Sequence, residues 1–385
     1  MINRIAEKEA VRLSKQYPVL TIVGPRQSGK TTLCQKVFEA YSYVSLENLE
    51  EREQALHDPK SFLTRFKEPL IIDEIQRVPS ILSYIQTRVD NSKKNGSYIL
   101  TGSQQFELME SLSQSLAGRT AILKLLPLTI KELHDHYKIY NSLEDYLYTG
   151  FYPRIYDQNL NPTESNTFYL STYVERDIRS LINIKDFLLF DRFLKVCASR
   201  TGQLLNMTSI GNECGISHNT VNQWLSLLEA SFIVYRVPPH FRNFSKRIIK
   251  SPKLFFYDVG FASYLLGIEA KEQLINHPLK GALFETLVAG ELLKARYNAV
   301  KGSNLYFFRD NSGHEVDCLL DRGNYCVPVE IKSSQTINES FFTNLQFYNS
   351  LQQDAAKPVL VYAGDESYSR KAAEVVSYLN LHGVN

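Results

Sequence analysis

Apolar runs long enough to cross a membrane are missing from the sequence, because no stretch approaches the roughly 20 residues that a spanning helix needs. Cysteine is scarce: five residues, an odd number at scattered spacings, fit neither a disulfide framework nor a zinc site. Residues 1–10 are too charged for a signal peptide, and we see neither internal repeats nor low-complexity stretches. These absences predict a cytoplasmic protein in a reducing environment, with no membrane partner.

A large excess of charge of one sign is also missing. Lysine and arginine number 43 and aspartate and glutamate number 41, which leaves a net charge of +2. That balance excludes a grossly basic chain but allows local basic patches. The composition, with 44% apolar and 22% charged residues, is that of an ordinary globular protein. A chain of 385 residues is too long for one core, so we expect about two or three domains.

The strongest motif is "YPVLTIVGPRQSGKTTLCQKVF", in which an apolar strand leads through GxxxxGKT into a helical pattern. This is the context that a P-loop requires, because glycines let backbone N–H groups close around phosphates at a helix N-terminus. Lys30 would reach the β- and γ-phosphates of ATP, and Thr31 would hold Mg²⁺. The predicted nucleotide-binding residues are Gly24, Pro25, Arg26, Gln27, Ser28, Gly29, Lys30, Thr31 and Thr32.

A second motif, "EPLIIDEIQ", is an apolar strand that ends in Asp73 and Glu74. Such a run is often only a strand followed by a solvated loop. Behind a P-loop, however, the aspartate at this strand end coordinates Mg²⁺ and the adjacent glutamate orients the attacking water. We therefore predict Asp73 as a ligand to Mg²⁺ and Glu74 as a catalytic residue.

A third strand pattern, "GSYILTGSQQF", places Ser103 and Gln104 just beyond its end. Ligands bind at the carboxyl ends of strands in open α/β sheets, so either residue would sense a phosphate or position water, unless it only caps a helix. Arg119 precedes a further apolar strand. It would stabilise phosphoryl-transfer charge, in its own chain or from a neighbouring subunit of a homo-oligomer, or form an ordinary salt bridge.

The middle of the chain combines a helical stretch with a helix-turn-helix pattern. Arg176 and Arg179 lie near one another on a predicted helix, where they would face a phosphate or pair with surface acids. Further on, residues 209–214 predict a short helix, Gly215 a turn, and Ser217 the cap of a second helix.

Two strands, "FIVYRV" and "KLFFYD", would follow the second helix as a wing. The segment between Glu229 and Asp258 has no acidic residue. Its basic residues are Arg236, Arg242, Lys246, Arg247, Lys250 and Lys253, together with His240. Polar residues at the start of the second helix are Ser217, His218, Asn219, Asn222 and Gln223. This pattern suits phosphate and base contacts in DNA, although winged helices also serve as protein-interaction modules.

The last third predicts an apolar helix, "GALFETLVAGELLKAR", that carries Glu285, and then a hairpin, "HEVDCLLDRGNYCVPVEIKSS". A turn centred on residues 322–323 would pair residue 317 near residue 328 and make Glu330 its diagonal neighbour. Glu330 and Lys332 are two residues apart and share that face. Two carboxylates can hold a second divalent metal, and a nearby ammonium stabilises phosphorane charge.

A helical glutamate, then aspartate, then Glu-x-Lys after a hairpin resembles the PD-(D/E)xK nuclease superfamily. The resemblance implies that Asp317 and Glu330 are metal ligands and catalytic residues, that Lys332 is the catalytic lysine, and that Glu285 is an accessory ligand. Glu315 lies on the same face and is therefore an alternative to Asp317 in this assignment.

The whole chain resembles a large prokaryotic family of predicted AAA-type ATPases that have a C-terminal domain of unknown function. The motifs that match are "GPRQSGKTTL", "IIDEIQ", "LTGSQQF", "LAGR", "YVERDI", "KLFFYDVGFASYLLG", "GALFETLV", "HEVDCLL" and "VEIKSS". The resemblance implies ATP binding and does not define the biological role.

The predicted fold is therefore α/β, with a P-loop parallel sheet followed by a winged helix and a restriction-endonuclease-like α/β domain. The expected domains are residues 1–135 (ATPase), 136–190 (helical lid or connector), 191–260 (winged helix-turn-helix) and 261–385 (nuclease-like). We expect a Mg²⁺-dependent ATPase that acts on DNA through a metal-dependent nuclease. The alternatives are an ATP-controlled switch with a catalytically silent nuclease-like domain, and an ATP-driven protein remodeller.

Overall fold

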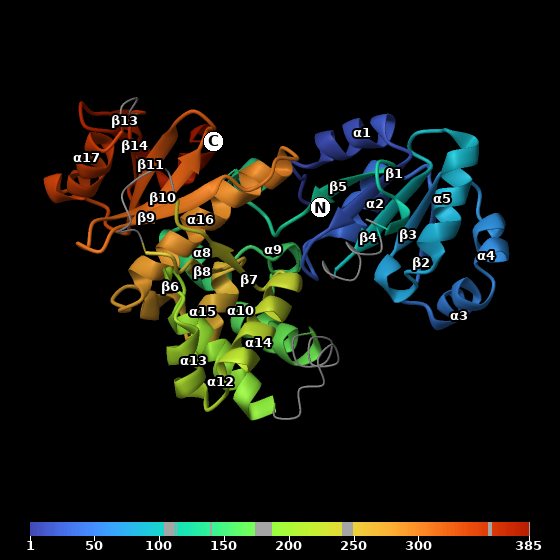
Figure 1. Ribbon diagram of the computed structural model, residues 1–385, viewed down its shortest axis with the longest axis horizontal. Helices are drawn as coiled ribbons and strands as arrows, with labels where there is room; N and C mark the ends of the chain where they lie inside the picture. The colour runs from blue at the N-terminus through green and yellow to red at the C-terminus, as the bar shows by residue number, and fades with distance from the viewer. Residues whose placement is uncertain are drawn as a thin grey trace. The chain divides into compact units, whose positions relative to one another are not determined.

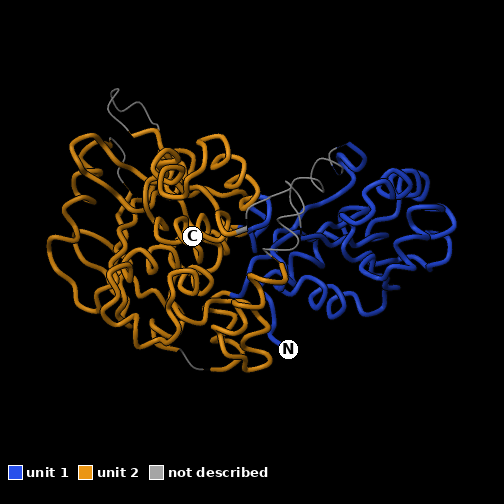
Figure 2. Tube along the Cα trace, turned by 90° about the horizontal axis from the view of Figure 1, so that it is seen from below, with its two compact units in different colours: residues 1–128, 230–232, 297–301 blue, residues 129–229, 233–296, 302–385 orange. Residues whose placement is uncertain are grey.

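The computed structural model describes residues 1–103, 112, 114–138, 141–173, 187–240, 249–352 and 356–384. The chain divides into two compact units (Figure 2). Unit 1 comprises residues 1–128, 230–232 and 297–301, and unit 2 comprises residues 129–229, 233–296 and 302–385. The finer boundaries after residues 135, 190 and 260 stay predictions. Within the described ranges, none of the helices is both long and apolar enough to cross a membrane.

Unit 1 is built on a parallel five-stranded sheet with the order β2-β3-β4-β1-β5 (Figure 1). Its strands are β1 (Val19–Val23), β2 (Ser42–Ser45), β3 (Leu70–Asp73), β4 (Tyr98–Gly102) and β5 (Thr120–Lys124). Strands β1, β3 and β4 are buried along their whole length, as their continuous apolar runs predict for a sheet covered on both faces. The predicted α/β fold with a parallel sheet is confirmed for this unit.

The helices of unit 1 cover the sheet and fix where its loops lie. They are α1 (Glu7–Gln16), α2 (Lys30–Val37), α3 (Leu49–His57), α4 (Pro59–Arg65) and α5 (Ile81–Ser92), with a 3₁₀ turn, η1 (Ile75–Arg77). Leu13 of α1 and Leu33 of α2 pack in one core with Leu20, Ile99 and Leu123 of the sheet. This packing holds the start of α2 at the carboxyl end of β1.

Unit 2 begins with helices and a small antiparallel sheet. The helices are α7 (Ile130–Tyr137), α8 (Leu143–Thr149), α9 (Pro153–Asp157), α10 (Pro162–Tyr169), α12 (Phe187–Ser199), α13 (Met207–Cys214), α14 (His218–Ala230) and α15 (Val259–Leu265), followed by the 3₁₀ turn η3 (Lys271–Leu274). The sheet has the order β6-β8-β7, with β6 (Gln203–Leu204), β7 (Val234–Val237) and β8 (Lys253–Phe256).

Helices α13 and α14 are the two helices that the sequence predicts on either side of Gly215. Gly215 ends α13 with a φ of 72°, a conformation that glycine adopts readily, and the Thr220 N–H donates to the Ser217 hydroxyl at 3.1 Å. Val221, Leu225 and Leu228 are buried on one face of α14, as their spacing requires. The predicted basic residues Arg242, Lys246 and Arg247, like Gln104, Arg176 and Arg179, lie outside the described residues.

The last part of unit 2 is a mixed six-stranded sheet with the order β13-β14-β12-β11-β10-β9 (Figure 1). Its strands are β9 (Leu305–Arg309), β10 (Glu315–Asp321), β11 (Cys326–Lys332), β12 (Val359–Tyr362), β13 (Tyr368–Ser369) and β14 (Glu374–Ser377). The accompanying helices are α16 (Lys280–Asn298), α17 (Thr343–Ser350) and the 3₁₀ turns η4 (Glu339–Phe342) and η5 (Tyr378–Gly383). Leu345 and Tyr348 of α17 pack against Leu319 and Leu360 of the sheet.

The hairpin between β10 and β11 has a register that differs from the expected one. Cys318 pairs with Val329 and Asp321 with Cys326, so the loop contains four residues instead of two. The physical reason is local: the Arg322 N–H donates to the Tyr325 carbonyl at 2.9 Å, and Gly323 takes a φ of 83°. Continuing this register puts residue 317 directly opposite residue 330. The predicted diagonal arrangement is therefore wrong, but both residues stay on one face.

The segment after β7 joins the two sheets of unit 2. Pro239 forms a β-bridge with Phe307 of β9, and the His240 N–H donates to the Phe307 carbonyl at 2.9 Å. On the return path the Ile249 N–H donates to the Arg309 carbonyl at 3.2 Å. Residues on both sides of the segment 241–248 are thus fixed by main-chain bonds to β9.

Candidate functional site

The P-loop of unit 1 links β1 to α2 and contains two residues with positive φ. Gly29 has a φ of 88° and Gln27 a φ of 62°. A Cβ atom at Gly24 would lie 2.0 Å from the Leu125 carbonyl oxygen, so a side chain there has no room. The loop therefore brings the first N–H groups of α2 to the carboxyl edge of the sheet, where they can bind an anion.

Lys30 is buried at the start of α2, with 6% of its surface exposed. Its ammonium donates to the Gly24 carbonyl at 3.0 Å and to the Pro25 carbonyl at 2.8 Å. Burial lowers the pKa of Lys30 to about 8, although the carboxylates of Glu74 and Asp73 oppose that shift. A phosphate oxygen beside Lys30 would restore the stability of its charged form.

Asp73 ends β3 and accepts hydrogen bonds from several hydroxyls. The Thr31 hydroxyl lies 3.0 Å from Asp73 Oδ2, and the Tyr43 hydroxyl lies 3.0 Å from the same oxygen. Thr101 of β4 also donates to this carboxylate. Burial and the neighbouring Asp73 carboxylate raise the pKa of Tyr43, which stays a hydrogen-bond donor. The hard oxygens of Thr31 and Asp73 fit Mg²⁺, which binds oxygen ligands.

Glu74 has a φ of 57° and a ψ of 46°, so its backbone turns sharply away from β3. The Glu74 carboxylate accepts a hydrogen bond from the Gln76 amide and lies 3.4 Å from the Ser103 hydroxyl. The Gln76 amide also donates to Ser103 at 3.1 Å. The structure therefore brings the predicted residues Glu74 and Ser103 together at the carboxyl ends of β3 and β4. Sequence reasoning did not single out Gln76, although Gln76 is the last residue of the motif "EPLIIDEIQ".

Two further residues support the loop or face it. The Ser28 hydroxyl is buried and has no hydrogen-bond partner among the described protein groups. Arg4, which sequence reasoning did not single out, donates to the Ser28 carbonyl at 2.7 Å and to the Leu126 carbonyl at 2.6 Å. A buried guanidinium that also donates to the Pro127 carbonyl at 3.4 Å fixes the loop from behind. No sequence pattern marks Arg4 for this role, because its partners are distant in the chain.

Two arginines predicted to lie at the nucleotide differ in their placement. Arg26 lies in the P-loop, with its guanidinium 3.7 Å from Glu47. Arg119 precedes β5, whose Thr120 pairs with Val19 at the start of β1, so it lies at the sheet edge opposite the P-loop. It forms a two-pronged ion pair with Asp90, at 2.5 and 2.9 Å. Within one chain Arg119 is thus not brought to the P-loop, and a role from a neighbouring subunit stays a prediction.

The second site lies in unit 2, where the β10–β11 hairpin gathers the predicted carboxylates and lysine. Lys332 lies 2.6 Å from Glu330 Oε1 and 3.7 Å from Asp317 Oδ2. The Ile331 N–H donates to Asp317 Oδ2 at 2.8 Å, which fixes that carboxylate against β11. Asp317, Glu330 and Lys332 therefore converge as predicted.

Lys253 of β8 also enters this cluster, which corrects its predicted position in a DNA-facing basic wing. Its side chain is 2% exposed and lies 2.8 Å from Glu285, 2.6 Å from Glu315 and 4.0 Å from Asp317. Burial alone would lower the pKa of Lys253, but the carboxylates of Glu285, Asp317 and Glu315 raise it above its usual range. The sequence pattern failed here because a basic residue at the start of a strand looks the same whether it faces solvent or a buried acid.

Arg236 is likewise engaged within the protein. It donates to Glu229 at 2.7 Å through Nε, and a second guanidinium nitrogen contacts the same carboxylate. Glu229 borders the basic segment on its N-terminal side. The first basic residue of that segment, Arg236, is therefore neutralised by a carboxylate of the same chain.

The carboxylates of the hairpin cluster hold protons more tightly than isolated acids do. Burial, and then the neighbouring Asp317 carboxylate, raise the pKa of Glu330 to about 8. Burial raises the pKa of Glu285 to about 7, although Lys253 opposes the shift. Both are buried carboxyl groups, and an additional cation would favour their charged forms.

The contacts leave two carboxylate oxygens for a divalent metal. Glu330 Oε2 is buried and has no hydrogen-bond partner among the described protein groups, because Lys332 contacts the other oxygen. Asp317 Oδ1 is the oxygen that Ile331 does not bind, and its neighbour Lys253 is 4.0 Å away. These hard oxygens fit Mg²⁺ or Mn²⁺. Glu285, predicted as an accessory ligand, is instead bound by Lys253.

Family comparisons agree with the fold of unit 1. Residues 16–134 match the family model of an AAA domain. The remaining stretches match two models that are each described as a domain of unknown function: residues 140–272 (DUF8612) and residues 280–382 (DUF4143). The stretch similar to an AAA domain thus includes the P-loop and all five strands of the parallel sheet of unit 1.

Individual proteins similar to this chain come from several organisms. An uncharacterised protein of Mycobacterium tuberculosis is 27% identical over 374 residues, which cover 95% of this chain and 81% of that protein. An uncharacterised protein of Haemophilus influenzae is 25% identical over 324 residues, which cover 74% of this chain and 76% of that protein. Among solved structures, a Walker-type ATPase of Pyrococcus abyssi has a TM-score of 0.46 with 14% identity, over 69% of this chain and 96% of its own.

Proposed function

We propose that unit 1 binds ATP with Mg²⁺ and hydrolyses it. The observation that carries this proposal is the convergence of Lys30, Thr31, Asp73 and Glu74 at one edge of the sheet, with a hydroxyl-to-carboxylate distance of 3.0 Å between Thr31 and Asp73. Mg²⁺ would neutralise phosphate charge when bound. Thr31 and Asp73 would hold it, and the N–H groups of the loop would bind the phosphate chain.

Lys30 and Glu74 would divide the remaining work. Lys30 would exchange its bonds to the Gly24 and Pro25 carbonyls for phosphate oxygens, which suit an ammonium better than neutral carbonyls. Glu74 would accept a hydrogen bond from the attacking water, with Gln76 and Ser103 holding its carboxylate in place. Phosphate release from ATP by the purified chain, with Mg²⁺ and with excess EDTA, tests the proposal. Turnover that is independent of the divalent ion would contradict it.

We propose in addition that the hairpin cluster of unit 2 hydrolyses phosphodiesters with a divalent metal. The buried Glu330 oxygen, together with Asp317 and Lys332 within 4 Å of one another, supports this function. Asp317 and Glu330 would hold the metal, which polarises the phosphate when bound. The Lys332 ammonium would stabilise charge on the phosphate oxygens. The rival hypothesis is a silent scaffold, since Lys253 already supplies one positive charge to the cluster.

A cleavage assay distinguishes these hypotheses. Linear, supercoiled, single-stranded and branched DNA would be incubated with the full chain and Mg²⁺ or Mn²⁺, with and without ATP. The matched variant is Asp317→Ala. Cleavage by the wild type and not by Asp317→Ala would support a nuclease regulated or driven by ATP. If the protein hydrolyses ATP but leaves every substrate intact, the switch with a silent C-terminal site is the better account.

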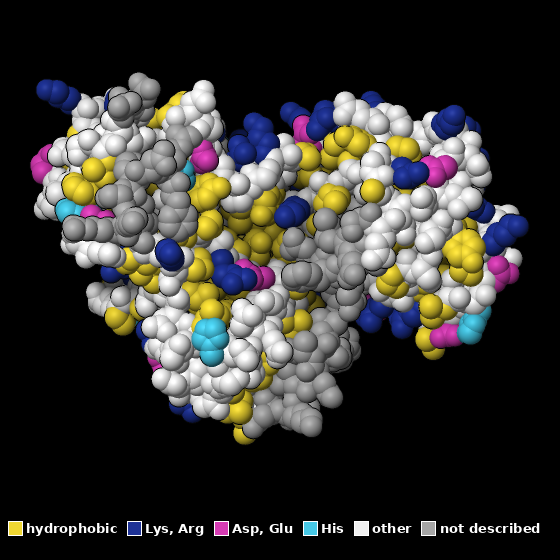
Figure 3. All heavy atoms as spheres, viewed as in Figure 1, with side chains coloured by type: hydrophobic (Ala, Val, Ile, Leu, Met, Phe, Trp, Pro, Cys, Tyr) yellow, Lys and Arg dark blue, Asp and Glu magenta, His cyan; other side chains and the backbone are white. Residues whose placement is uncertain are grey.

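DNA is the partner that the helix-turn-helix element favours. Ser217, His218 and Asn219 are exposed at the start of α14, as are Asn222 and Gln223 one turn later. Short polar side chains at the first turns of such a helix are suited to base edges and phosphates. On the face shown in Figure 3, the Lys and Arg side chains of the described residues lie singly or in small groups. We assign DNA contact to unit 2 because it contains the helix-turn-helix element.

Replacing Arg242, Lys246 and Arg247 together with alanine tests this assignment. Loss of three phosphate contacts would weaken binding and reduce the slope of log affinity against log salt by roughly 3. Unchanged affinity at every salt concentration would move DNA contact to another surface or dismiss it.

A further inference from the structure

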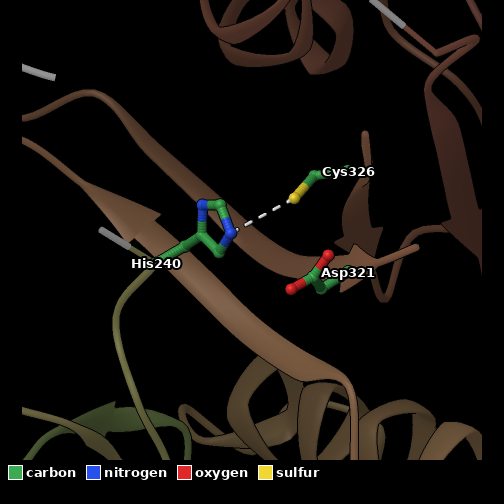
Figure 4. Close-up of side chains that lie close together, drawn as sticks. All are labelled: His240, Asp321 and Cys326. Atoms are coloured by element: carbon green, nitrogen blue, oxygen red, sulfur yellow. Dashed lines mark hydrogen bonds between the residues drawn. The ribbon is translucent and has the colours of Figure 1, made fainter. Parts of the chain in front are cut away.

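Three side chains from two segments distant in sequence meet at the loop end of the β10–β11 hairpin (Figure 4). Asp321 ends β10 and Cys326 begins β11, and the two residues pair across the hairpin. His240 reaches them from the segment after β7, where its N–H donates to the Phe307 carbonyl. One ligating atom from each side chain lies within 4.8 Å of the other two.

The orientation of the His240 ring decides between two kinds of chemistry. Its Nε2 atom lies 3.3 Å from the Cys326 sulfur. In a nucleophilic triad the acid binds the other ring nitrogen and orients the imidazole from behind. In Figure 4 the Asp321 carboxylate lies instead on the side of the ring that faces Cys326. Sulfur, imidazole nitrogen and carboxylate oxygen therefore face a common point, which is the arrangement of metal ligands.

The spacing fits a tetrahedral ion. Bond lengths of about 2.3 Å to sulfur and about 2.0 Å to nitrogen place these two ligand atoms about 3.5 Å apart in a tetrahedral zinc site. The observed separation of 3.3 Å is close to that value. An Asp321 oxygen completes the set, because one ligand atom from each side chain lies within 4.8 Å of the other two.

The exposure of the three side chains suits a bound metal, because two are shielded from solvent and the third is accessible. His240 and Cys326 are buried, whereas Asp321 is partly exposed at the end of its strand. The backbone on both sides is fixed, since Arg322 and Tyr325 close the hairpin loop and Phe307 binds the main chain of His240. A metal ion arriving along Asp321 would find two ligands already held in place.

We propose that His240, Asp321 and Cys326 bind one zinc ion or a similar divalent transition metal, with water in the fourth position. A thiolate and an imidazole select such ions over Mg²⁺. The site is separate in chemistry from the all-oxygen pair Asp317 and Glu330 and does not depend on the proposed nuclease. By tying the segment after β7 to the hairpin, the metal would stabilise the joint between the two sheets of unit 2.

Cobalt replacement tests the proposal on the full chain. Metal-stripped protein would be titrated with Co²⁺ and followed by absorption. We expect saturation near one equivalent, with thiolate-to-cobalt charge-transfer absorption in the near ultraviolet and the visible bands of tetrahedral cobalt. Cys326→Ser should remove the charge-transfer band, and Asp321→Asn should weaken binding at least about tenfold.

Cys318→Ser is the matched control, because Cys318 is a buried cysteine of the same hairpin that pairs with Val329 and points to the opposite face. It should keep the cobalt spectrum. X-ray absorption of the zinc-loaded wild type, which needs no variant, should show a single sulfur in the first shell. A zinc shell without sulfur, or a charge-transfer band that persists in Cys326→Ser, would overturn the site.

Discussion

The P-loop edge of unit 1 and the hairpin cluster of unit 2 both contain buried charged groups. The charge that burial destabilises is positive at the P-loop edge and negative in the hairpin cluster. At the P-loop edge burial destabilises the charged ammonium of Lys30 and lowers its pKa to about 8. In the hairpin cluster burial destabilises the charged carboxylates, so the pKa of Glu330 is raised to about 8 and that of Glu285 to about 7. The first site gains from an added phosphate and the second from an added cation.

The two sites also differ in how much of their charge is already neutralised inside the protein. Asp73 is bound by hydroxyls, which leave its negative charge available to Mg²⁺. Glu285 and Glu315 instead share the buried Lys253. Residue type alone therefore does not define a metal site, because the internal counter-ions decide which oxygens remain for a metal.

The largest effect should come from removing the cation of the P-loop. We expect Lys30→Ala to reduce ATP hydrolysis by at least about a hundredfold, since the phosphates lose their principal positive partner. Lys36→Ala is the control: Lys36 lies on the same helix but pairs with Glu7 at 2.6 Å. Steady-state phosphate release measures both. Hydrolysis by Lys30→Ala at the wild-type rate would remove the P-loop from the mechanism.

Glu74→Gln should separate binding from turnover. The amide keeps the shape of the carboxylate but cannot accept a proton, so we expect turnover to fall about tenfold to a thousandfold while ATP still binds. Fluorescent-nucleotide binding and single-turnover hydrolysis measure the two effects, with the exposed Glu53→Gln as control. Equal losses of affinity and rate would instead assign Glu74 a role in holding the loop.

Lys253→Met should destabilise unit 2 by about 3 kcal/mol, because the substitution leaves buried carboxylates without their cation. Lys280→Met, which breaks the more exposed pair with Glu144, should cost less than about 1 kcal/mol. Denaturant unfolding measures both variants. Added Mn²⁺ should recover part of the loss in Lys253→Met. Unfolding unaffected by Lys253→Met would show that the cluster does not need this counter-ion.

Glu330 should also make the stability of the protein depend on pH. The pKa of Glu330 is about 8 in the folded protein against an ordinary value of 4.5, so the folded state keeps a proton that the unfolded state loses. In metal-free protein this contribution to stability is complete below pH 4.5 and is lost as the pH rises through about 8. Glu330→Gln, which does not titrate, should flatten the decline measured by thermal unfolding in EDTA. A decline of unchanged steepness would exclude Glu330 as its source.

Local patterns were read correctly from the sequence because their physics is local. The P-loop, the strand ending in Asp73 and Glu74, and the helices around Gly215 each depend on neighbouring residues, and the structure has them in place. The convergence of Asp317, Glu330 and Lys332 followed from strand alternation, which survives an error of two residues in the hairpin register.

Contacts between distant segments were not accessible to the same reasoning. Arg4, which supports the P-loop, and Lys253, which enters the acidic cluster, carry no local mark of their burial. The scattered spacing of the cysteines indicates no zinc site, yet His240 and Cys326 are brought together across 86 positions of chain because the segment after β7 pairs with β9. Only the tertiary fold supplies such proximity.

The position of Lys253 also affects which fragments of this chain can be studied separately. Residues 140–272 and 280–382 match two separate family models, but the ammonium of Lys253 lies in the first stretch and its partners Glu285 and Glu315 lie in the second. A fragment that starts at residue 280 would keep its acids and lose their counter-ion. Such a fragment would attract divalent ions through charge alone, and its metal affinity would say little about the parent chain. The two stretches are therefore best expressed, and compared between relatives, as one piece.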